Sequence, residues 1–346
     1  MSSINDIAKE AGVSIATVSR AFSDGSNINQ STRKIILEIA HRMDYSPKIY
    51  HKHTPSHINT EIIGVIISCR NYPWFNMIAS GINTVMESKN ITPIFTDTNE
   101  MPYKEIICID KIKDFVGGML VISSSGLDDY NTTYIEKINK TIPIVTLVRN
   151  INIYNIDSVA VDCFHHTSKA LNRLIENGHH HIAIINGPMV IKPSMDRFAA
   201  YIEVLKSNDI PIRNEYIYYG DFDENHAYNI ANELLDSNPR VTAIFSSNTI
   251  ITRGCLKAIN DRNLKIPDDI AFISYGDDYS FSLKNMNITA IEDPNYNIGK
   301  IAAELLLERM QDSRRLKKKP KRIIVSPDLI FRGSEAYPKN REKFRF

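Results

Sequence analysis

A short stretch near the start of the chain carries side chains whose types and spacing suit contact with the edges of base pairs. Arg20 can donate two parallel hydrogen bonds to guanine O6 and N7, and Ile15 and Ala16 can contact thymine methyl groups. Three hydroxyl side chains that can bind phosphate oxygens lie beside them: Ser14, Thr17 and Ser19. The same spacing also occurs on an ordinary amphipathic helix that ends in an exposed arginine.

Two short helices joined by a tight turn would place these side chains on one face. Ser3 begins a pattern typical of a capping box, and Gly12 can adopt the left-handed conformation that ends a first helix. Ser14 is placed to cap the second helix. Val18 and Phe22 are four residues apart and are predicted to point inward, which leaves the groups described above on the opposite side. This arrangement is that of a helix-turn-helix.

A third helix is predicted to complete a small domain over residues 1–48. Asn29 can cap a helix that runs from about Gln30 to Met43, and Asn29 is itself a candidate contact to DNA. The apolar residues predicted to pack on the first two helices are Ile35, Ile36, Ile39 and Ala40.

Residues 49–60 are polar, rich in histidine and interrupted by Pro55, and they are predicted to form a hinge or linker. Tyr50 and Lys52 are candidate contacts to DNA within this segment. The first 60 residues hold seven Lys and Arg against five Asp and Glu, a net charge of only +2. DNA binding must therefore depend on where the charges lie, and a dimer would double the number of contacts.

The head sequence resembles the N-terminal signature of the lactose and galactose repressor (LacI/GalR) family. The matching residues are Asp6-Ile7-Ala8-Lys9, Ala11-Gly12-Val13-Ser14 and Thr17-Val18-Ser19-Arg20. Weaker matches in the same order extend the resemblance to about residues 3–334. The resemblance implies a DNA-binding head joined to a core similar to periplasmic sugar-binding proteins, with an effector bound between two lobes. The leucine that the family usually carries in its hinge is absent from His51–Pro55.

The residues after 61 independently predict an α/β core. Continuous β-branched and apolar runs alternate with amphipathic helices, which is typical of parallel sheets covered on both faces. The predicted fold is an all-α helix-turn-helix head plus two doubly wound parallel-sheet lobes that span 61–334, followed by a polar tail over 335–346. Lobe 1 is predicted over about 61–161 and 291–326, and lobe 2 over about 162–290 and 327–334. Ligands of such folds bind at the carboxyl ends of the strands.

Eight residues are candidate effector contacts in the cleft between the lobes. Arg197 matches the arginine that clamps the effector in the family, and a guanidinium can hold sugar hydroxyls or a carboxylate with two parallel bonds. Asn248 matches a family asparagine that faces the ligand, and Asp277 follows a strand where the family usually has two adjacent aspartates. The other candidates are aromatic or polar residues near strand ends: Trp74, Phe75, Phe222, Arg149 and Asp162.

Several of these candidates have an equally plain structural interpretation. An aromatic residue near a strand end is often part of a core, and Arg197 could be a surface arginine. Gly276 replaces the first of the two family aspartates, and Asp293 stands where many relatives carry glutamine. These departures prevent a particular sugar from being assigned.

Composition and motifs exclude several other classes of protein. The 346 residues carry a net charge of +1, and we find neither an export signal nor an apolar run of roughly 18 residues, so we expect a cytoplasmic protein without a membrane partner. The four cysteines have no paired spacing, and the adjacent histidines 179–181 cannot all face one ion. No phosphate loop, metalloprotease helix or nucleophile elbow is present, so we expect no metal, no cofactor and no enzymatic activity.

The sequence therefore favours a sequence-specific transcriptional regulator, most simply a repressor of a carbohydrate-utilisation operon. Its expected partners are a palindromic double-stranded operator, a sugar or sugar-phosphate effector and a second copy of the chain, with a tetramer also possible. A solute-binding protein of a transport system is one alternative, but it would need an export signal. An α/β enzyme with a helical appendage is another, but it would need a catalytic motif.

Overall fold

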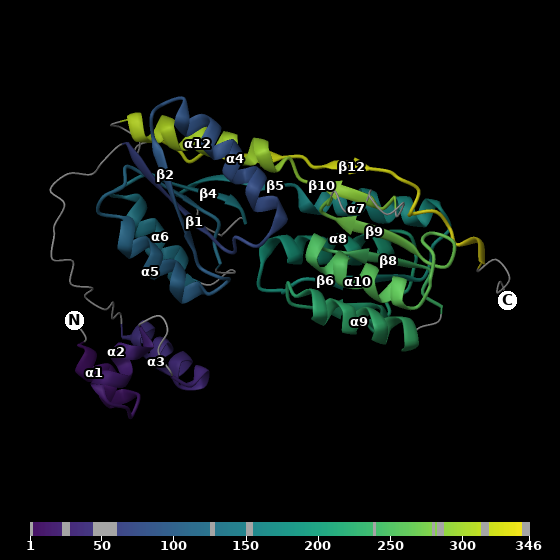
Figure 1. The fold of residues 1–346 in the computed structure, drawn as a ribbon, viewed down its shortest axis with the longest axis horizontal. Coiled ribbons are helices and arrows are strands. Elements are labelled where there is room, and N and C mark those ends of the chain that lie inside the picture. Colours follow the sequence, from purple (N-terminus) through teal and green to yellow (C-terminus); the bar gives the residue numbers. More distant parts are fainter. Residues whose placement is uncertain are drawn as a thin grey trace. The chain divides into compact units, whose positions relative to one another are not determined.

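The computed structural model describes residues 3–22, 28–43, 61–124, 129–149, 155–237, 240–278, 281, 287–312 and 318–340. The chain divides into two compact units, a head unit over Met1–Ile58 and a core unit over Asn59–Phe346 (Figure 1). Each unit is described by itself. Among the described residues, no helix is long and apolar enough to cross a membrane.

The head unit contains three helices, α1 (Ile4–Glu10), α2 (Ile15–Ala21) and α3 (Gln30–Arg42). The predicted capping box is confirmed, because the Ser3 hydroxyl accepts from the backbone N–H of Asp6 and the Asp6 carboxylate accepts from that of Ser3. Gly12 makes the turn with a φ of +64°. The three helices share a small core of Ile7, Ala8, Val18, Ala21, Ile36, Ile39 and Ala40.

One packing prediction in the head unit is wrong. Ile35 was expected to face the first two helices, but its side chain is 51% exposed. Ile36, Ile39 and Ala40 already form the inward stripe of α3, and Ile35 lies about 100° around the helix from Ile36. Phe22 is only partly buried at the edge of the same core.

Lobe 1 of the core unit is a six-stranded parallel sheet in the order β11-β5-β4-β3-β1-β2. Its strands are β1 (Ile62–Ile67), β2 (Thr92–Asp97), β3 (Met119–Val121), β4 (Ile144–Val148), β5 (Asp157–Val161) and β11 (Arg322–Val325). Helices α4 (Pro73–Glu87) and α12 (Asn295–Gln311) cover one face, and α5 (Pro102–Ile112) and α6 (Asp129–Asn139) cover the other (Figure 1). Gly81 and Gly299 let α4 and α12 approach closely, since a Cβ at either position would lie 2.1 Å from a backbone oxygen of the other helix.

Lobe 2 repeats the same winding in the order β12-β10-β9-β8-β6-β7. Its strands are β6 (Ile182–Asn186), β7 (Ile217–Tyr219), β8 (Ala243–Ser246), β9 (Ala271–Tyr275), β10 (Thr289–Glu292) and β12 (Asp328–Ile330), of which only β12 runs antiparallel among the described pairings. Helices α7 (Cys163–Glu176) and α8 (Lys192–Ser207) pack on one face, and α9 (Glu224–Ser237) and α10 (Thr249–Asp261) on the other. The predicted fold of two doubly wound lobes is confirmed.

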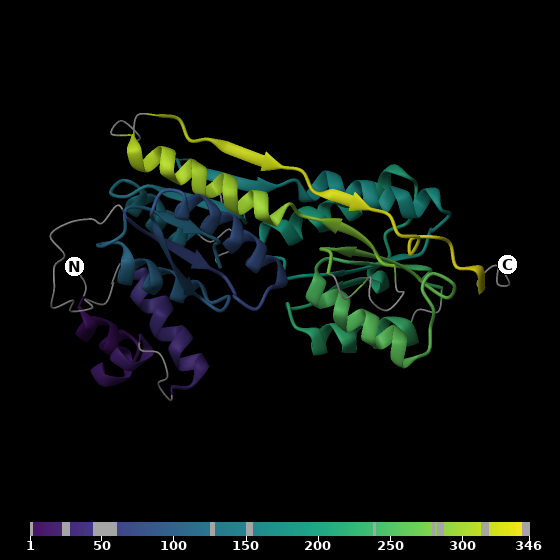
Figure 2. The same cartoon turned by 45° about the horizontal axis from the view of Figure 1, so that its top comes forward.

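The chain passes between the lobes three times, after β5, after β10 and after β11. Figure 2 shows the last passage as the yellow segment that leaves β11 and continues through β12 along lobe 2. The described residues beyond β12 stay on this lobe: Ser334 bonds with the backbone of Phe272, and the side chain of Asn340 donates to Asp269. The residues expected to begin a polar tail are therefore docked on lobe 2 as far as Asn340.

Candidate nucleic-acid interface and interlobe cleft

The second helix of the head unit has a buried side and an exposed side. Val18 and Ala21 are fully buried, whereas Ile15 is 50% exposed and Ala16 and Arg20 are also exposed. A half-exposed isoleucine and an exposed arginine on the same short helix are side chains that can contact base edges. The division of this helix into two sides agrees with the sequence prediction.

Polar contacts fix the ends of this helix. The Ser14 hydroxyl accepts from the backbone N–H of Thr17 at 3.1 Å, and the two hydroxyl oxygens are 2.8 Å apart. Arg33 on α3 donates from Nε to the carbonyl of Ala21 at 2.8 Å, a contact that the sequence did not suggest. Of the other candidates, Ser19 and Asn29 are exposed. Tyr50 and Lys52 lie outside the described residues.

In the core unit, a cavity of about 810 Å³ lies between the two lobes at the carboxyl ends of their strands. Lobe 1 contributes Tyr72, Glu100, Pro102 and Ser124, and lobe 2 contributes Pro188, Met189, Val190, Ile191, Met195, Asp221, Phe222 and Asp223. The rings of Tyr72 and Phe222 meet edge to face across the cleft with centroids 5.7 Å apart. This is the position that the doubly wound fold predicts for a ligand.

The three aromatic candidates lie in different places. Phe222 lines the cavity, and Trp74 stacks on Tyr72, with ring centroids 5.5 Å apart. Phe75 is not part of the lining: it is 8% exposed and packs edge to face on Phe95 within the core of lobe 1. Because α4 begins at Pro73, position 75 already turns toward the sheet.

Arg149 stands behind the cavity and is paired with a lining carboxylate. Its side chain is 5% exposed, and its Nη1 and Nη2 atoms lie 2.6 and 2.5 Å from the two oxygens of Glu100. Nη1 also donates to the carbonyl of Ser123 at 3.0 Å. Tyr72 forms a hydrogen bond with the same glutamate, and burial, followed by the charge of Glu100, raises the pKa of Tyr72. This network was missed by the sequence reasoning, because residues that bond directly in it are up to 49 positions apart.

A second carboxylate that the sequence reasoning missed holds the backbone beside the cavity. Glu105 on α5 is fully buried and accepts from the Ser123 hydroxyl, the Ser124 backbone N–H and the Asn131 amide at 3.1, 2.7 and 2.9 Å. These bonds fix the chain where β3 ends at the cleft. Its position in the apolar pattern of α5 gave no signal of this role.

Arg197, on α8 of lobe 2, is not among the residues that line the cavity and lies in an aromatic and acidic environment. Its guanidinium carbon is 3.6 Å from the ring centroid of Tyr275, and its Nη2 is 3.8 Å from Cys163 Sγ. The Tyr275 hydroxyl in turn donates to Asp293 Oδ1 at 3.0 Å. The side chain of Arg197 is buried, and its Nε has no hydrogen-bond partner among the described residues.

Burial acts differently on the charged groups of this cluster. It raises the pKa of Asp293, while Arg197 and the Tyr275 hydroxyl oppose that rise. Burial alone would lower the pKa of Arg197, but Cys163, Tyr275 and Asp293 reverse the direction and raise it. Burial also raises the pKa of Cys163 to about 11, so this thiol stays protonated at neutral pH.

The three remaining effector candidates hold local structure and do not line the cavity. Asp162 caps α7 by accepting from the His165 backbone N–H at 3.1 Å, and Asn248 caps α10 by accepting from that of Ile251 at 2.7 Å. Asp277 is paired with Arg332, whose Nη1 lies 2.9 Å from Asp277 Oδ1. Polar residues directly after a strand commonly serve as helix caps, and this interpretation accounts for the first two.

Several buried polar atoms of lobe 2 have no hydrogen-bond partner among the described residues. Asn186 Oδ1 and Ser247 Oγ lie at or just after the ends of β6 and β8, and Ser194 Oγ and Arg197 Nε lie in the first two turns of α8. Gly187 lies among them, and a Cβ at this position would be 2.5 Å from the ring of Phe222. Buried polar groups normally have partners, so this cluster can accept hydrogen bonds from, or donate them to, a polar ligand.

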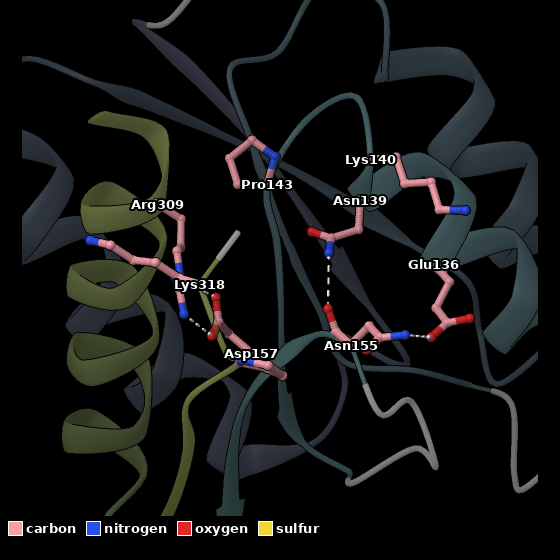
Figure 3. Close-up of a pocket in the computed structure, with 9 residues that line it drawn as sticks. Glu136, Asn139, Lys140, Pro143, Asn155, Asp157, Arg309 and Lys318 are labelled. Carbon is pink, nitrogen blue, oxygen red and sulfur yellow. Dashed lines mark hydrogen bonds and ion pairs between the residues drawn. The ribbon is translucent and has the colours of Figure 1, made fainter. Parts of the chain in front are cut away.

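A second cavity of about 420 Å³ lies at the amino ends of β4 and β5 in lobe 1 (Figure 3). Arg309 and Asp157 form one wall, with Nε–Oδ2 and Nη2–Oδ1 distances of 2.7 and 2.8 Å, and Asp157 also accepts from the Lys321 backbone N–H. Asn139 and Asn155 on the opposite wall are joined by a hydrogen bond of 3.2 Å. No candidate site residue from the sequence lines this cavity, and Arg309 Nη1 in its wall has no hydrogen-bond partner among the described residues.

The histidine run does not converge on one point. His179 Nδ1 is 2.9 Å from the Thr242 hydroxyl and its Nε2 is 3.3 Å from the carbonyl of Glu335, whereas His181 Nδ1 is 2.9 Å from the Tyr216 hydroxyl. Burial lowers the pKa of His179 to about 4. Within the described part of the chain, no group of His, Cys, Asp and Glu side chains is arranged to hold a metal ion.

Comparison with known proteins agrees with this architecture. Residues 3–48 match the model of the bacterial regulatory proteins of the lacI family, and residues 171–335 match the periplasmic binding protein-like domain. The HTH-type transcriptional repressor PurR of Actinobacillus pleuropneumoniae serotype 3 is 28% identical over 336 residues, which cover 96% of this chain and 98% of that protein. The ribose operon repressor of Halalkalibacterium halodurans is 27% identical over 320 residues, which cover 90% and 91%.

Solved structures share the fold. The transcriptional regulator CelR in complex with cellobiose superposes with a TM-score of 0.72 at 22% identity, over 96% of this chain and all of that chain. The transcription regulator CcpA of Lactococcus lactis superposes with a TM-score of 0.69, also at 22% identity, over 80% and 99%. The relatives named above are transcriptional repressors and regulators, and they share the head motif or the two-lobed fold with this chain. The chain is thus similar to the lacI family of bacterial regulatory proteins in its head and to periplasmic binding protein-like domains in its core.

Proposed function

We propose that this protein represses a carbohydrate-utilisation operon and that a small hydroxylated effector in the interlobe cleft controls its affinity for the operator. The observation that carries the proposal is the exposed side of α2, where Ile15, Ala16 and Arg20 stand over the buried Val18 and Ala21. The types and exposure of these side chains fit the major groove.

In this proposal the head reads base edges with few residues. Arg20 binds a guanine, Ile15 and Ala16 contact thymine methyl groups, and Ser14, Thr17, Ser19 and Asn29 bind the backbone phosphates. A homodimer would place two heads on the half-sites of a palindromic operator, with a tetramer as a further possibility. Tyr50 and Lys52 would add contacts from the linker.

The cleft would bind the effector between an aromatic pair and a set of buried polar atoms. Tyr72 and Phe222 offer ring surfaces, and Asn186, Ser194 and Ser247 offer polar atoms that lack protein partners. Closure of the two lobes on the ligand would couple to the head only if the ligand binds the two lobe arrangements with different affinities. The named relatives include a ribose operon repressor and PurR repressors, so the ligand panel should contain both sugars and purines.

The test is binding of the full-length protein to DNA from its own upstream region, compared with random DNA at fixed salt. Arg20→Ala should lower discrimination by about 1–3 kcal/mol for each guanine read, because the bidentate contact is lost. Arg42→Ala is the matched control: it also removes an exposed arginine of the head, one paired with Glu10, and should leave discrimination unchanged. Equal losses in both variants, or no preference of the wild type for its own DNA, would contradict the proposal.

The effector arm of the test uses Arg197→Ala. This variant should bind the operator normally but lose the response to the effector that shifts the melting temperature of the wild type. A variant that keeps its response would remove Arg197 from the site without affecting the assignment of the head.

A further inference from the structure

We propose that the interlobe cleft selects an uncharged, hydroxylated effector and discriminates against phosphorylated or acidic ones, because carboxylates of this chain already serve as counter-ions for both cleft arginines. The inference deepens the proposed function and rests on it. It narrows the sugar or sugar-phosphate class that the sequence suggests to its neutral members.

The counter-ion of Arg149 is in direct contact. Both terminal nitrogens of Arg149 face both oxygens of Glu100, and the arginine is 5% exposed while the glutamate is 26% exposed. Glu100 therefore lies between Arg149 and the cavity that it lines. An anionic ligand on this side would meet the carboxylate before the guanidinium, and a hydroxyl could donate to that carboxylate.

The counter-ion of Arg197 acts through an intervening ring. The guanidinium carbon lies 3.6 Å from the ring centroid of Tyr275, and the hydroxyl of the same tyrosine donates to the buried Asp293. The negative charge of Asp293 offsets the positive charge of Arg197. The Nε of Arg197 remains without a partner among the described residues. The arginine can thus still donate a hydrogen bond to a ligand without needing a negative charge from it.

The other charged residues that line the cavity are also acidic. Asp221 and Asp223 also line the cavity, and none of the described lining residues is Lys, Arg or His. The loop that contributes Met189, Val190 and Ile191 supplies an apolar wall, with Val190 66% exposed. Carboxylates around an apolar and aromatic wall favour a neutral ligand with one apolar face and several hydroxyl donors.

The experiment measures anion binding in wild type and in variants that remove one negative charge. Inorganic phosphate is the probe, with glucose and glucose 6-phosphate, and ribose and ribose 5-phosphate, as matched pairs followed by calorimetry and by operator release. The wild type should show no phosphate binding at millimolar concentration. Asp293→Asn should bind phosphate at least about tenfold more tightly than the wild type, a difference in binding free energy of about 1.4 kcal/mol. Asn is isosteric, so the Tyr275 hydroxyl keeps an acceptor.

Two further variants keep the test decisive. Glu100→Gln uncovers Arg149 at a less buried position and should gain phosphate binding even if Asp293→Asn does not fold. Asp221→Asn removes a carboxylate of the same lining whose described ion pair is with His226 and not with an arginine, so its gain should be smaller than that of either arginine-partner variant. Phosphate binding by the wild type, no gain in either arginine-partner variant, or an equal gain in Asp221→Asn would overturn the inference.

The outcomes also separate this inference from the proposed function. Operator release by a sugar phosphate in preference to its neutral partner would overturn the inference and leave the repressor assignment standing. Absence of specific operator binding would overturn the assignment itself, whatever the phosphate variants show.

Discussion

Two buried arginines of the core unit have different kinds of partner. At the cavity of Figure 3, Arg309 makes two short bonds to Asp157 and a third to the carbonyl of Lys319. At the interlobe cleft, Arg197 lies on the ring of Tyr275 and reaches its acidic neighbour only through that ring. Both guanidinium groups are largely removed from water, so the difference lies in their partners and not in their burial.

The contrast indicates which arginine is structural and which is available to a ligand. Arg309 joins the end of α12 to the start of β5, and its two bonds to Asp157 are fully used inside the lobe. Arg197 keeps a buried Nε without a described partner, at the carboxyl ends of the strands where ligands of this fold bind. Arg309 also has one buried nitrogen without a described partner, Nη1, so the two arginines differ in the carboxylate that pairs with Arg309 and not in the presence of an unsatisfied donor.

The largest expected effect comes from breaking the Arg309 pair. Asp157→Asn should lower the free energy of unfolding by about 3–5 kcal/mol, because it leaves a buried guanidinium without its counter-charge. Arg197→Met should cost less than about 2 kcal/mol, since it removes no short hydrogen bond to oxygen and Asp293, whose pKa burial already raises, can take up a proton. Urea unfolding of the full chain measures both. Equal losses would erase the distinction between the two arginines.

A third buried basic group extends the comparison to a site without a carboxylate contact. His179 is fully buried, with the Thr242 hydroxyl and the Glu335 carbonyl as its ring partners, and burial lowers its pKa to about 4. The unfolded chain, with a histidine pKa near 6.5, binds more protons than the folded chain between these two values. Stability is thus fully present above about pH 6.5 and should fall by up to about 3 kcal/mol as the pH decreases to about 4.

The variant His179→Gln should flatten this dependence, and the exposed neighbour His180 supplies the control. His180→Gln should leave the slope of the unfolding free energy against pH as in the wild type. If His179→Gln keeps the full slope, other groups titrate in that window and the neutral burial of His179 is not its cause.

The fold was predictable from the sequence because its signals are local. The capping box at Ser3, the turn at Gly12 and the apolar runs of the strands each depend on residues within a few positions of one another. The head surface followed from the same helical spacing. Ile35 was misplaced because an apolar stripe of four residues is wider than the inner face of α3.

The cleft was predictable only in part, because its contacts are made across the lobes. Arg197 and Phe222 were placed near the cavity, but Glu100, Tyr72 and Glu105 were missed. Their roles arise from partners far along the chain, such as Arg149 for Glu100. Asp162 and Asn248 were predicted to contact the effector but cap helices instead. The sequence pattern of a polar residue after a strand is the same for a helix cap and for a ligand contact.

The smallest expected effect tests whether the cleft around Arg197 is open to a ligand at all. In Gly187→Ala the new methyl group would lie 2.5 Å from the ring of Phe222 and 2.9 Å from the Ser194 hydroxyl, so the ring must move into the cavity. We expect effector affinity to fall about fivefold, or about 1 kcal/mol, while the free energy of unfolding changes less, because reduced freedom of the unfolded chain offsets the clash. Gly220→Ala is the matched control, since its methyl group would meet only Ile230 at 3.4 Å and Asn186 at 3.8 Å and should leave affinity unchanged. Unaltered effector affinity in Gly187→Ala would mean that the ligand does not contact the Phe222 side of the cleft. The difference between the interlobe cleft and the cavity beside Arg309 would then depend on Arg197 alone.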